Sequence, residues 1–371
     1  MRWYLVIYAA VGLLLGGLVY LTFAVSRFGL IRKAKKKWAR ALLSLGAVAL
    51  CFGVSTLFMG LVNTFVVFIH AVVFFLLFGL GFRIAAAIRK KKFRINWQGW
   101  LALGATVIVL SVGFVLCHHV FRTEYALTTE KTLGLGLREN GTVRIALIAD
   151  SHIGATFDGE GFAEHLETIK SERPDVLFIA GDFVDDSSRR ADVERACEAL
   201  AGVDAPLGVW YVYGNHDRGY GRSRDFDARD LERMLADSGV HVLEDEAVEL
   251  GDLCVVGRKD ASSRHRKELS ELLEGVDPDK YIVVLDHQPT DYEKESETAA
   301  DLVLSGHTHG GQLWPLEYVG EGFGINDRTY GYERRGGTDF IVTSGISCWE
   351  IDFKTGTKSE YVIIEVHGTT P

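Results

Sequence analysis

The chain has 371 residues, more than one ordinary domain requires, and its net charge of −9 conceals a sharp division. No Asp or Glu precedes Glu124, whereas that first part holds fifteen of the 40 Lys and Arg residues. The remainder therefore carries 25 basic residues against all 49 acidic ones, a net charge of −24. These values exclude a single, uniformly charged globular domain, and we expect two physically different parts joined end to end.

The first part is predicted to cross a membrane four times, as a transmembrane region of residues 1–122. Each apolar stretch has the ~20 residues that a helix needs to span ~30 Å of hydrocarbon. These stretches are Tyr4–Ala24, Ala41–Val62, Thr64–Phe82 and Leu101–Val120. Only Asn63 separates the middle two, which predicts a tight helical hairpin. A cleaved signal peptide is the alternative for the first stretch, but its start carries one charge and no A-x-A site follows.

Two short basic loops, Arg27–Arg40 and Arg83–Arg94, set the expected orientation. Two spans separate these loops, so both lie on one side of the membrane, and positive loops mark the cytoplasmic side. The amino terminus and, after the fourth span, the acidic part are then extracytoplasmic. Between such apolar stretches the loops favour contact with anionic membrane lipids, and no nucleic acid is expected as a partner.

Residues 123–140 are predicted to be a linker, and residues 141–371 are predicted to form an α/β domain. Strands and helices alternate at first, which favours a sheet with parallel pairs, and shorter strands follow closely after Val240. Two packed sheets with helices outside are therefore expected. The predicted strands are Gly141–Ala149, Val176–Ala180, Val209–Tyr213, Val240–Leu243, Ala247–Leu250, Leu253–Val256, Ile282–Leu285, Leu302–Leu304, Phe340–Thr343 and Tyr361–Val366. The predicted helices are Glu160–Glu172, Asp192–Ala201, Asp230–Ser238 and Arg264–Leu273.

The five cysteines show no CxxC spacing and are predicted to be unpaired thiols that pack as small hydrophobic groups. A pairing of Cys348 is the alternative. The cellular compartment does not follow from the cysteines.

Metal-binding residue types follow the predicted strands in a fixed order. They occur in Asp150-Ser151-His152, Gly181-Asp182, Gly214-Asn215-His216-Asp217, His287 and Gly306-His307-Thr308-His309. Open sheets place their ligands at strand ends, and mixed carboxylate, amide and imidazole groups suit Mn, Fe or Zn. The set is large enough for two adjacent ions. A carboxylate must then bridge them, and Asp182 is the best candidate. His216, beside a ligand, is predicted to act as a general acid that Asp217 orients.

This ordered set resembles the calcineurin-like metallophosphoesterase superfamily, in its membrane-bound branch with N-terminal transmembrane helices. The resemblance covers Arg144–Val366, and GNHD followed by GHTHGGQ is its most specific part. It implies a four-layer α/β/β/α sandwich of two mixed sheets. Many members carry an S-R-G-like turn where this chain has Thr343–Ser347 without an arginine, so a phosphate-gripping role for that turn is not expected.

The resemblance also implies two divalent metal ions. One would be bound by Asp150, His152, Asp182 and His309, and the second by Asp182, Asn215, His287 and His307. His216 matches the proton-donating histidine of the family. A hydroxide that bridges the ions would attack phosphorus in line, while both cations offset charge on the phosphoryl oxygens.

We therefore expect a membrane-anchored, binuclear metal-dependent phosphohydrolase of the cell membrane, acting on an envelope or lipid-linked phosphoester. The alternatives are a pyrophosphatase or phosphodiesterase that acts on nucleotide-linked sugar lipids, and a non-catalytic membrane metal-binding sensor. The substrate contacts stay open. One set of side chains could bind a phosphate or else belong to a solvated loop, namely Arg218, Arg222 and Arg224. A second set could line a substrate pocket or else pack against the sheet, namely Trp314, Tyr318, Tyr330 and Tyr332.

Overall fold

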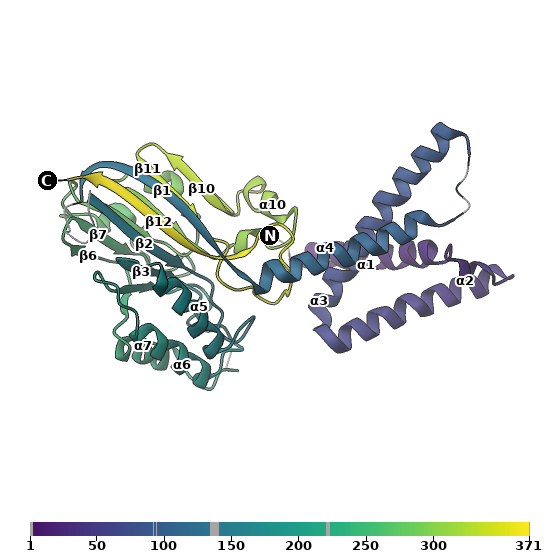
Figure 1. Cartoon of the computed structure of the whole chain (residues 1–371), viewed down its shortest axis with the longest axis horizontal. Coiled ribbons are helices and arrows are strands. Elements are labelled where there is room, and N and C mark those ends of the chain that lie inside the picture. Colours follow the sequence, from purple (N-terminus) through teal and green to yellow (C-terminus); the bar gives the residue numbers. More distant parts are fainter. Residues whose placement is uncertain (1–2, 92, 94, 134–140, 220–222, 371) are drawn as a thin grey trace. The chain divides into compact units, whose positions relative to one another are not determined.

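The computed structural model describes residues 3–91, 93, 95–133, 141–219 and 223–370 (Figure 1). The chain divides into two compact units, residues 1–112 and 113–371. The division falls inside the last predicted span, so the final turns of that helix belong to the second unit.

The first unit is helical. It contains α1 (Trp3–Val25), α2 (Gly29–Arg32), α3 (Lys37–Arg89) and the start of α4 (Trp97–His118). Within the described part of the chain, α3 and α4 are long and apolar enough to cross a membrane, and Val11–Val25 is a shorter apolar helical stretch. Two helices, rather than the four predicted spans, therefore meet these criteria.

Helix α3 turns back on itself at Gly60, whose φ of 76° and ψ of 171° are not helical. Glycine adopts this backbone conformation without the clash that a Cβ would cause. The hydroxyl groups of Thr56 and Thr64 lie 3.3 Å apart across the turn, and the rings of Phe52 and Phe65 lie 5.5 Å apart. A helical hairpin is thus present, but its turn lies at Gly60 and not at Asn63, which is buried within the helix.

The second unit is mixed α/β, with two mixed sheets of six strands each. The first sheet has the order β1-β12-β2-β3-β4-β5, in which β12 and β2 are antiparallel and β2 to β5 are parallel. Its strands are β1 (Val120–Thr132), β2 (Thr142–Ile148), β3 (Val176–Ala180), β4 (Val209–Val212), β5 (His241–Leu243) and β12 (Ser359–Thr369).

The second sheet has the order β10-β11-β9-β8-β7-β6, in which the four inner strands are parallel and both edge strands are antiparallel. Its strands are β6 (Glu246–Leu250), β7 (Leu253–Gly257), β8 (Tyr281–Leu285), β9 (Leu302–Ser305), β10 (Gly331–Arg335) and β11 (Thr338–Val342). Strand β10 and the short helices α9 (Tyr292–Ser296) and α10 (Leu316–Gly322) have no counterpart among the predicted elements.

Three apolar cores hold these layers together. One joins the facing sides of the two sheets, with Phe178 and Trp210 from the first sheet and Val283 from the second among its members. Another packs the first sheet against α5 (Gly159–Ser171), α6 (Arg190–Ala201) and α7 (Ala228–Asp237). The third packs the second sheet against α8 (Leu269–Leu272) and α9. Strands that are uniformly apolar in sequence are predicted to be buried on both faces. Strands that alternate between apolar and polar residues are predicted to be buried on one face.

The predicted linker 123–140 is not irregular where the structure describes it. Residues up to Thr132 belong to β1, which pairs in parallel with β12, and residues 134–140 lie outside the described residues. The side chains of β1 alternate between exposed and partly buried. An edge strand is exposed on one face, so its polar residues resemble a linker in sequence.

The prediction of unpaired cysteines is wrong for one pair. Cys117, in the last turn of α4, forms a disulfide with Cys348 across 231 positions of sequence. Among the remaining cysteines, Cys197 and Cys254 are buried and Cys51 is exposed. Spacing in the sequence could not reveal this pair, because only the fold brings the end of α4 beside the loop after β11.

Candidate metal centre

All seven predicted ligands lie at or just beyond the carboxyl ends of strands. Asp150 follows β2, Asp182 follows β3, and Asn215 follows β4, three parallel neighbours in the first sheet. His287 and His307 follow β8 and β9, parallel neighbours in the second sheet. The carboxyl ends of parallel strands share one edge, so the packing of the two sheets brings these side chains together.

The backbone at these positions is strained. Five non-glycine residues have a positive φ, an uncommon conformation that clusters at functional sites. They are Asp150 at 53°, His152 at 38°, Asp182 at 51°, His307 at 70° and His309 at 48°. Gly181, which precedes Asp182, has no room for a side chain, because a Cβ there would lie 2.6 Å from Nδ1 of His287.

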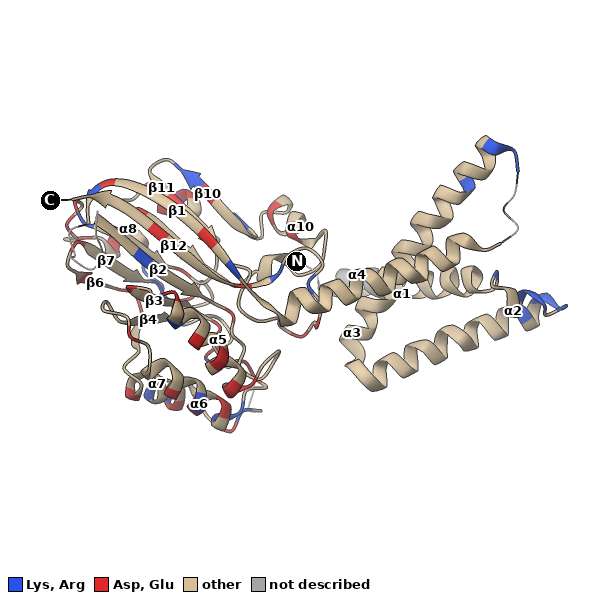
Figure 2. Ribbon diagram, viewed as in Figure 1, with Lys and Arg blue, Asp and Glu red and all other residues tan. Residues whose placement is uncertain are grey.

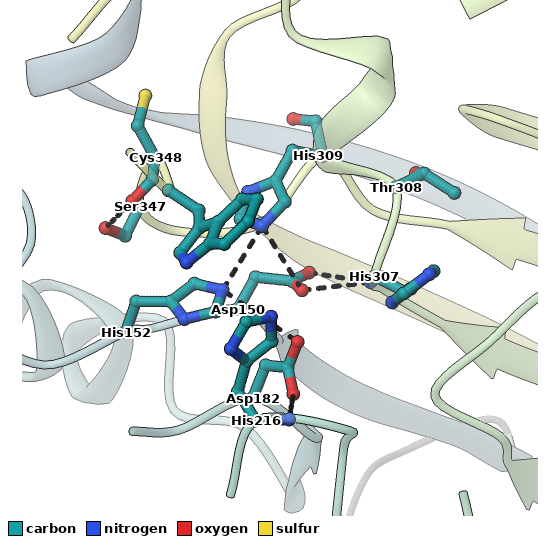
Figure 3. Close-up of polar contacts among 12 residues, drawn as sticks. Asp150, His152, Asp182, His216, His307, Thr308, His309, Ser347 and Cys348 are labelled. Atoms are coloured by element: carbon teal, nitrogen blue, oxygen red, sulfur yellow. Dashed lines mark hydrogen bonds and ion pairs between the residues drawn. The ribbon is translucent and has the colours of Figure 1, made fainter. Parts of the chain in front are cut away.

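One group of potential ligands consists of Asp150, His152 and His309, all buried. The Nε2 atoms of the two imidazoles face each other at 3.2 Å, and Nε2 of His309 lies 3.8 Å from Oδ1 of Asp150 (Figure 3). The Asp150 carboxylate also accepts hydrogen bonds from the backbone N–H of His307, at 3.0 Å to each oxygen. Lone pairs thus converge on one point, which is what a cation requires.

The second group consists of Asp182, His287 and His307. Nε2 of His287 lies 3.1 Å from Oδ2 of Asp182 and 3.2 Å from Oδ1 of Asn215. Donor atoms at ~2.1 Å from one ion are separated by ~3.0–3.4 Å, so these spacings fit a coordinated cation.

Asp182 lies between the two groups. Its Oδ2 is 3.1 Å from Nε2 of His287 and 3.9 Å from Nε2 of His152. Its Oδ1 accepts a hydrogen bond from the backbone N–H of His216 at 2.8 Å. One carboxylate is therefore placed to serve both groups, as the sequence predicts.

The ring of His287 has a defined tautomer. Its Nδ1 lies 2.7 Å from the backbone oxygen of Ala180 and so carries the donated proton, since a carbonyl oxygen only accepts. Nε2 faces the oxygens of Asp182 and Asn215, and it would offer its lone pair to a cation that displaces the proton held there. A histidine that binds a metal through one nitrogen commonly donates from the other in this way.

Burial sets the charge of the imidazoles. It lowers the pKa of His152 and of His307 to about 4 and holds the pKa of His309 well below its usual range. These three rings are therefore neutral at neutral pH, and each can offer a lone pair to a cation. At His287 burial also opposes the charge, but the Asp182 carboxylate outweighs it and raises the pKa.

The two central carboxyl groups differ. Burial raises the pKa of Asp150 to about 7. Burial has the same effect at Asp182, yet the neighbouring His287 outweighs it and holds the pKa below its usual range. A concentration of buried carboxylates and imidazoles of this kind is costly without a cation between them.

His216 lies beside the first group. Its ring centroid is 5.1 Å from that of His152 and 5.1 Å from the indole of Trp349. The role of Asp217 in orienting this imidazole stays a prediction, and the structure shows that its carboxylate holds the backbone. Its carboxylate accepts from the N–H groups of Asp182 at 2.8 Å, Phe183 at 2.8 Å and Gly214 at 2.7 Å, and so ties the two ligand-bearing turns together.

Lys354 is a residue that the sequence prediction missed. Its side chain is fully buried, and Nζ donates a hydrogen bond to the backbone oxygen of Ser344 at 2.6 Å. The next residue, Gly345, lies on Asp150, since a Cβ there would be 2.7 Å from Cβ of Asp150. Burial lowers the pKa of Lys354 to about 7, with Asp150 and Glu360 acting against it. A lysine in a polar loop gives no signal of this burial.

The predicted arginine loop contacts protein groups where it is described. Arg218 pairs with Glu244 and lies 4.9 Å above the ring of Tyr213. Arg224 donates to the backbone oxygen of Asp217 at 3.1 Å. Arg222 lies outside the described residues.

The comparisons with known proteins agree with this geometry. A sequence model of the calcineurin-like phosphoesterase family matches residues 143–311. An uncharacterized metallophosphoesterase of Aquifex aeolicus is 32% identical over 202 residues, which cover 53% of this chain and 72% of that protein. The chain belongs to this family. It is accordingly a phosphoester hydrolase, and the family generally uses two divalent metal ions.

Two further relatives differ in how much of them the chain covers. A transmembrane protein with a metallophosphoesterase domain from Bos taurus is 27% identical, over 59% of this chain and 52% of that protein. The uncharacterized metallophosphoesterase YkuE of Bacillus subtilis is 25% identical, over 76% of this chain and 98% of that protein. The chain thus spans about half the length of the bovine relative.

Proposed function

We propose that this phosphoesterase is a membrane-attached, binuclear enzyme that hydrolyses an envelope or lipid-linked phosphoester. The observation that carries the binuclear part is the position of Asp182, whose Oδ2 lies within 3.9 Å of an imidazole nitrogen from each ligand group. One ion is assigned to Asp150, His152, Asp182 and His309. The other is assigned to Asp182, Asn215, His287 and His307. The mixture of oxygen and imidazole donors suits Mn, Fe or Zn.

Bound there, the cations would supply an activated water and offset charge on the phosphoryl oxygens. The chain's own residues do the rest. His216 lies next to the ligand groups without being a member of either, and it donates a proton to the departing alkoxide. Asp150, His152, Asp182, His287 and His309 are buried, and burial strengthens the charge interactions among them.

Membrane attachment is supported by α3 and α4, and by relatives from Bos taurus and Danio rerio that are named as transmembrane proteins. We assign four crossings, with α1, the two arms of α3 and α4 as the spans. The described Lys and Arg residues of the two basic loops gather at one end of the helical unit (Figure 2). That end is cytoplasmic by the positive-inside rule, and the acidic second unit is then extracytoplasmic.

The Cys117–Cys348 disulfide also supports an extracytoplasmic second unit, because disulfides persist in oxidising compartments and are rare in the cytosol. An extracytoplasmic metal site next to a membrane helix would meet phosphoesters of the envelope. This reasoning favours a lipid-linked substrate.

The test compares purified full-length wild-type protein with His216→Ala and Asp182→Asn. Metal content and hydrolysis are measured on an aryl phosphodiester, an aryl phosphomonoester and a nucleotide-diphosphate lipid. We expect two metal ions per wild-type chain, a rate loss of roughly 10²–10⁴-fold in His216→Ala with unchanged metal content, and loss of metal in Asp182→Asn.

A full rate in His216→Ala would refute the proposed acid. Wild-type protein that binds two ions but hydrolyses none of the three esters would favour the non-catalytic sensor. Cleavage confined to the nucleotide-diphosphate lipid would identify the pyrophosphatase alternative.

A further inference from the structure

Large apolar side chains stand exposed directly after the last metal-binding motif. They lie on α10 and its two flanks, and Phe323 and Trp314 are 81% and 62% exposed. The complete set, named here the α10 patch, is Trp314, Leu316, Tyr318, Val319, Phe323 and Ile325. The surface of a soluble protein rarely exposes so many large apolar side chains in one short segment unless that segment binds a partner or a membrane.

Helix α10 is fixed to the rest of the second unit by hydrogen bonds and by close packing. Thr329, which is buried, donates through its hydroxyl to the backbone oxygen of Glu317 at 2.8 Å. Oε1 of Glu321 accepts from the backbone N–H of Thr329, also at 2.8 Å. Gly311 packs against the start of the helix, since a Cβ there would lie 2.5 Å from N of Glu317. The helix is thus fixed on one face and presents apolar groups on the other.

The patch adjoins the metal centre. The turn His309–Gly311 holds a proposed ligand, and Gln312 then accepts through its backbone oxygen from the N–H groups of Thr355 at 2.9 Å and Gly356 at 3.2 Å. Trp314 donates its own N–H to Oγ1 of Thr355 at 3.2 Å. The base of the patch is therefore bound to the loop that follows Cys348.

The same loop is bound to the end of α4. The N–H of Lys354 donates to the backbone oxygen of Gly113 at 2.9 Å, and the rings of Phe114 and Phe353 lie 6.4 Å apart. The disulfide of Cys117 with Cys348 adds a covalent link. One loop, residues 348–356, thus connects the final turns of an apolar helix to the patch, and all of these residues belong to the second unit.

We propose that the α10 patch inserts into the headgroup–acyl boundary of the bilayer that α4 enters. This inference rests on the membrane attachment proposed above. Trp and Tyr favour that boundary because one end of each ring system is apolar and the other is polar, and Leu and Phe supply the buried face of interfacial helices. The segment 314–325 contains no Lys or Arg, so apolar insertion rather than attraction to anionic lipid provides the contact.

The consequence concerns substrate access. Because α10 follows the His309–Gly311 turn closely along the chain, a patch that inserts into the membrane holds the metal centre near the bilayer surface. The phosphoester of a lipid in the same leaflet then reaches the metal centre while its acyl chains stay in hydrocarbon. We therefore assign a membrane-resident phospholipid-type ester, and not a released soluble ester, as the substrate class.

The test uses full-length protein in vesicles of phosphatidylcholine and phosphatidylglycerol, with Cys51, Cys197 and Cys254 replaced by Ala. A fluorophore is attached to single cysteines introduced as Leu316→Cys, Phe323→Cys, Ile108→Cys and Glu198→Cys. Ile108 lies in α4 and reports membrane attachment, whereas Glu198 is exposed on α6. Two lipids are then added in separate experiments, one with a doxyl quencher near its headgroup and one with the quencher deep in its acyl chain, because Ile108 lies at mid-span and residues 316 and 323 are expected near the surface.

We expect quenching of roughly twofold or more at positions 316, 323 and 108, and none at 198. Quenching at 108 without quenching at 316 and 323 would overturn this inference and leave membrane attachment intact. No quenching at 108 would overturn both. If the patch binds a protein partner and not lipid, position 108 will be quenched while positions 316 and 323 will not.

A second measurement follows hydrolysis. In Leu316→Ser/Phe323→Ser we expect the ratio of the rate on a vesicle-borne phosphoester to the rate on a soluble aryl phosphodiester to fall roughly tenfold. Glu198→Ser is the matched control, and its ratio stays at the wild-type value. An unchanged ratio in the double variant would contradict the proposed route of access.

Discussion

The indole of Trp349 lies 5.1 Å from the imidazole of His216, centroid to centroid, at an interplanar angle of 57°. Trp349 is 39% exposed, whereas its neighbour Cys348 is buried and linked to Cys117. The disulfide therefore anchors the residue directly before Trp349, and the indole of Trp349 lies beside the proposed proton donor. If His216 donates this proton as proposed, we expect the alcohol part of the substrate to contact Trp349.

Trp349→Ala should raise KM for the aryl phosphodiester and lower kcat/KM roughly tenfold, since an aromatic contact contributes about 1–1.5 kcal/mol. Trp349→Phe keeps an apolar ring and should stay within about threefold of wild type by the same measure. Steady-state kinetics at saturating metal checks both variants. Equal losses in Ala and Phe would exclude a simple contact with the leaving group.

Asp217→Ala should destabilise the second unit. Its carboxylate accepts from backbone N–H groups in both ligand-bearing turns, and removal leaves buried donors without a partner. We expect a loss of about 3 kcal/mol, or a fall in Tm of roughly 6–12 °C, measured by thermal unfolding. Asp237→Ala, on the exposed end of α7, is the control and should change little. A normal Tm in Asp217→Ala would show that these bonds are not needed to hold the turns.

Lys354→Met should reduce activity without reducing stability. The lysine supports the Ser344–Gly345 turn that lies on Asp150, and a change of this kind beside a ligand costs roughly 10–100-fold in metal affinity or activity. Methionine, however, removes a buried charge, so the Tm of metal-free protein should hold or rise.

Metal titration and calorimetry together separate these two effects. Lys358→Met, at a partly exposed lysine, should leave the metal affinity unchanged. A fall in Tm with normal metal affinity would mean that Lys354 serves only the packing.

Glu295 should make stability fall as pH rises. Its carboxyl is buried 2.8 Å from Nη1 of Arg258, and burial raises its pKa to about 8. A carboxyl with a raised folded-state pKa contributes stability fully below its unfolded pKa of ~4.3, and that contribution is lost as pH rises towards 8. For one proton, the free energy of unfolding can fall by at most about 1.4 kcal/mol per pH unit.

Thermal unfolding between pH 5 and pH 8 should show the Tm of Glu295→Gln gaining on that of wild type as pH rises. Glu293→Gln, which changes an exposed neighbour, should follow the wild-type curve. Parallel curves for Glu295→Gln and wild type would contradict the raised pKa.

Cys117 and Cys348 should be linked in protein taken from intact cells. Mass spectrometry of non-reduced peptides should find the linked pair, and Cys348→Ser should lower Tm, because a native disulfide contributes about 2–5 kcal/mol. In intact cells a cysteine introduced as Glu164→Cys should react with a reagent that cannot cross the membrane. Labelling only after lysis would place the second unit in the cytoplasm and overturn the proposed orientation.

The sequence alone determined the main elements of the second unit and the seven candidate ligands. Strand periodicity locates the carboxyl ends of β2, β3, β4, β8 and β9, and the polar groups that follow them are local in sequence. A motif such as Gly214-Asn215-His216-Asp217 needs no distant partner to be recognised, so residue types and order were sufficient.

Only the tertiary structure decided features that depend on contacts between distant segments. β1 was predicted to be a linker because the polar residues on the exposed face of an edge strand resemble a linker in sequence. The pairing of Cys117 with Cys348, the burial of Lys354 and the exposed α10 patch depend on which loops meet after the two sheets pack. Local propensity carries no information about such encounters, since they arise from chain segments more than two hundred positions apart or from the absence of a covering neighbour.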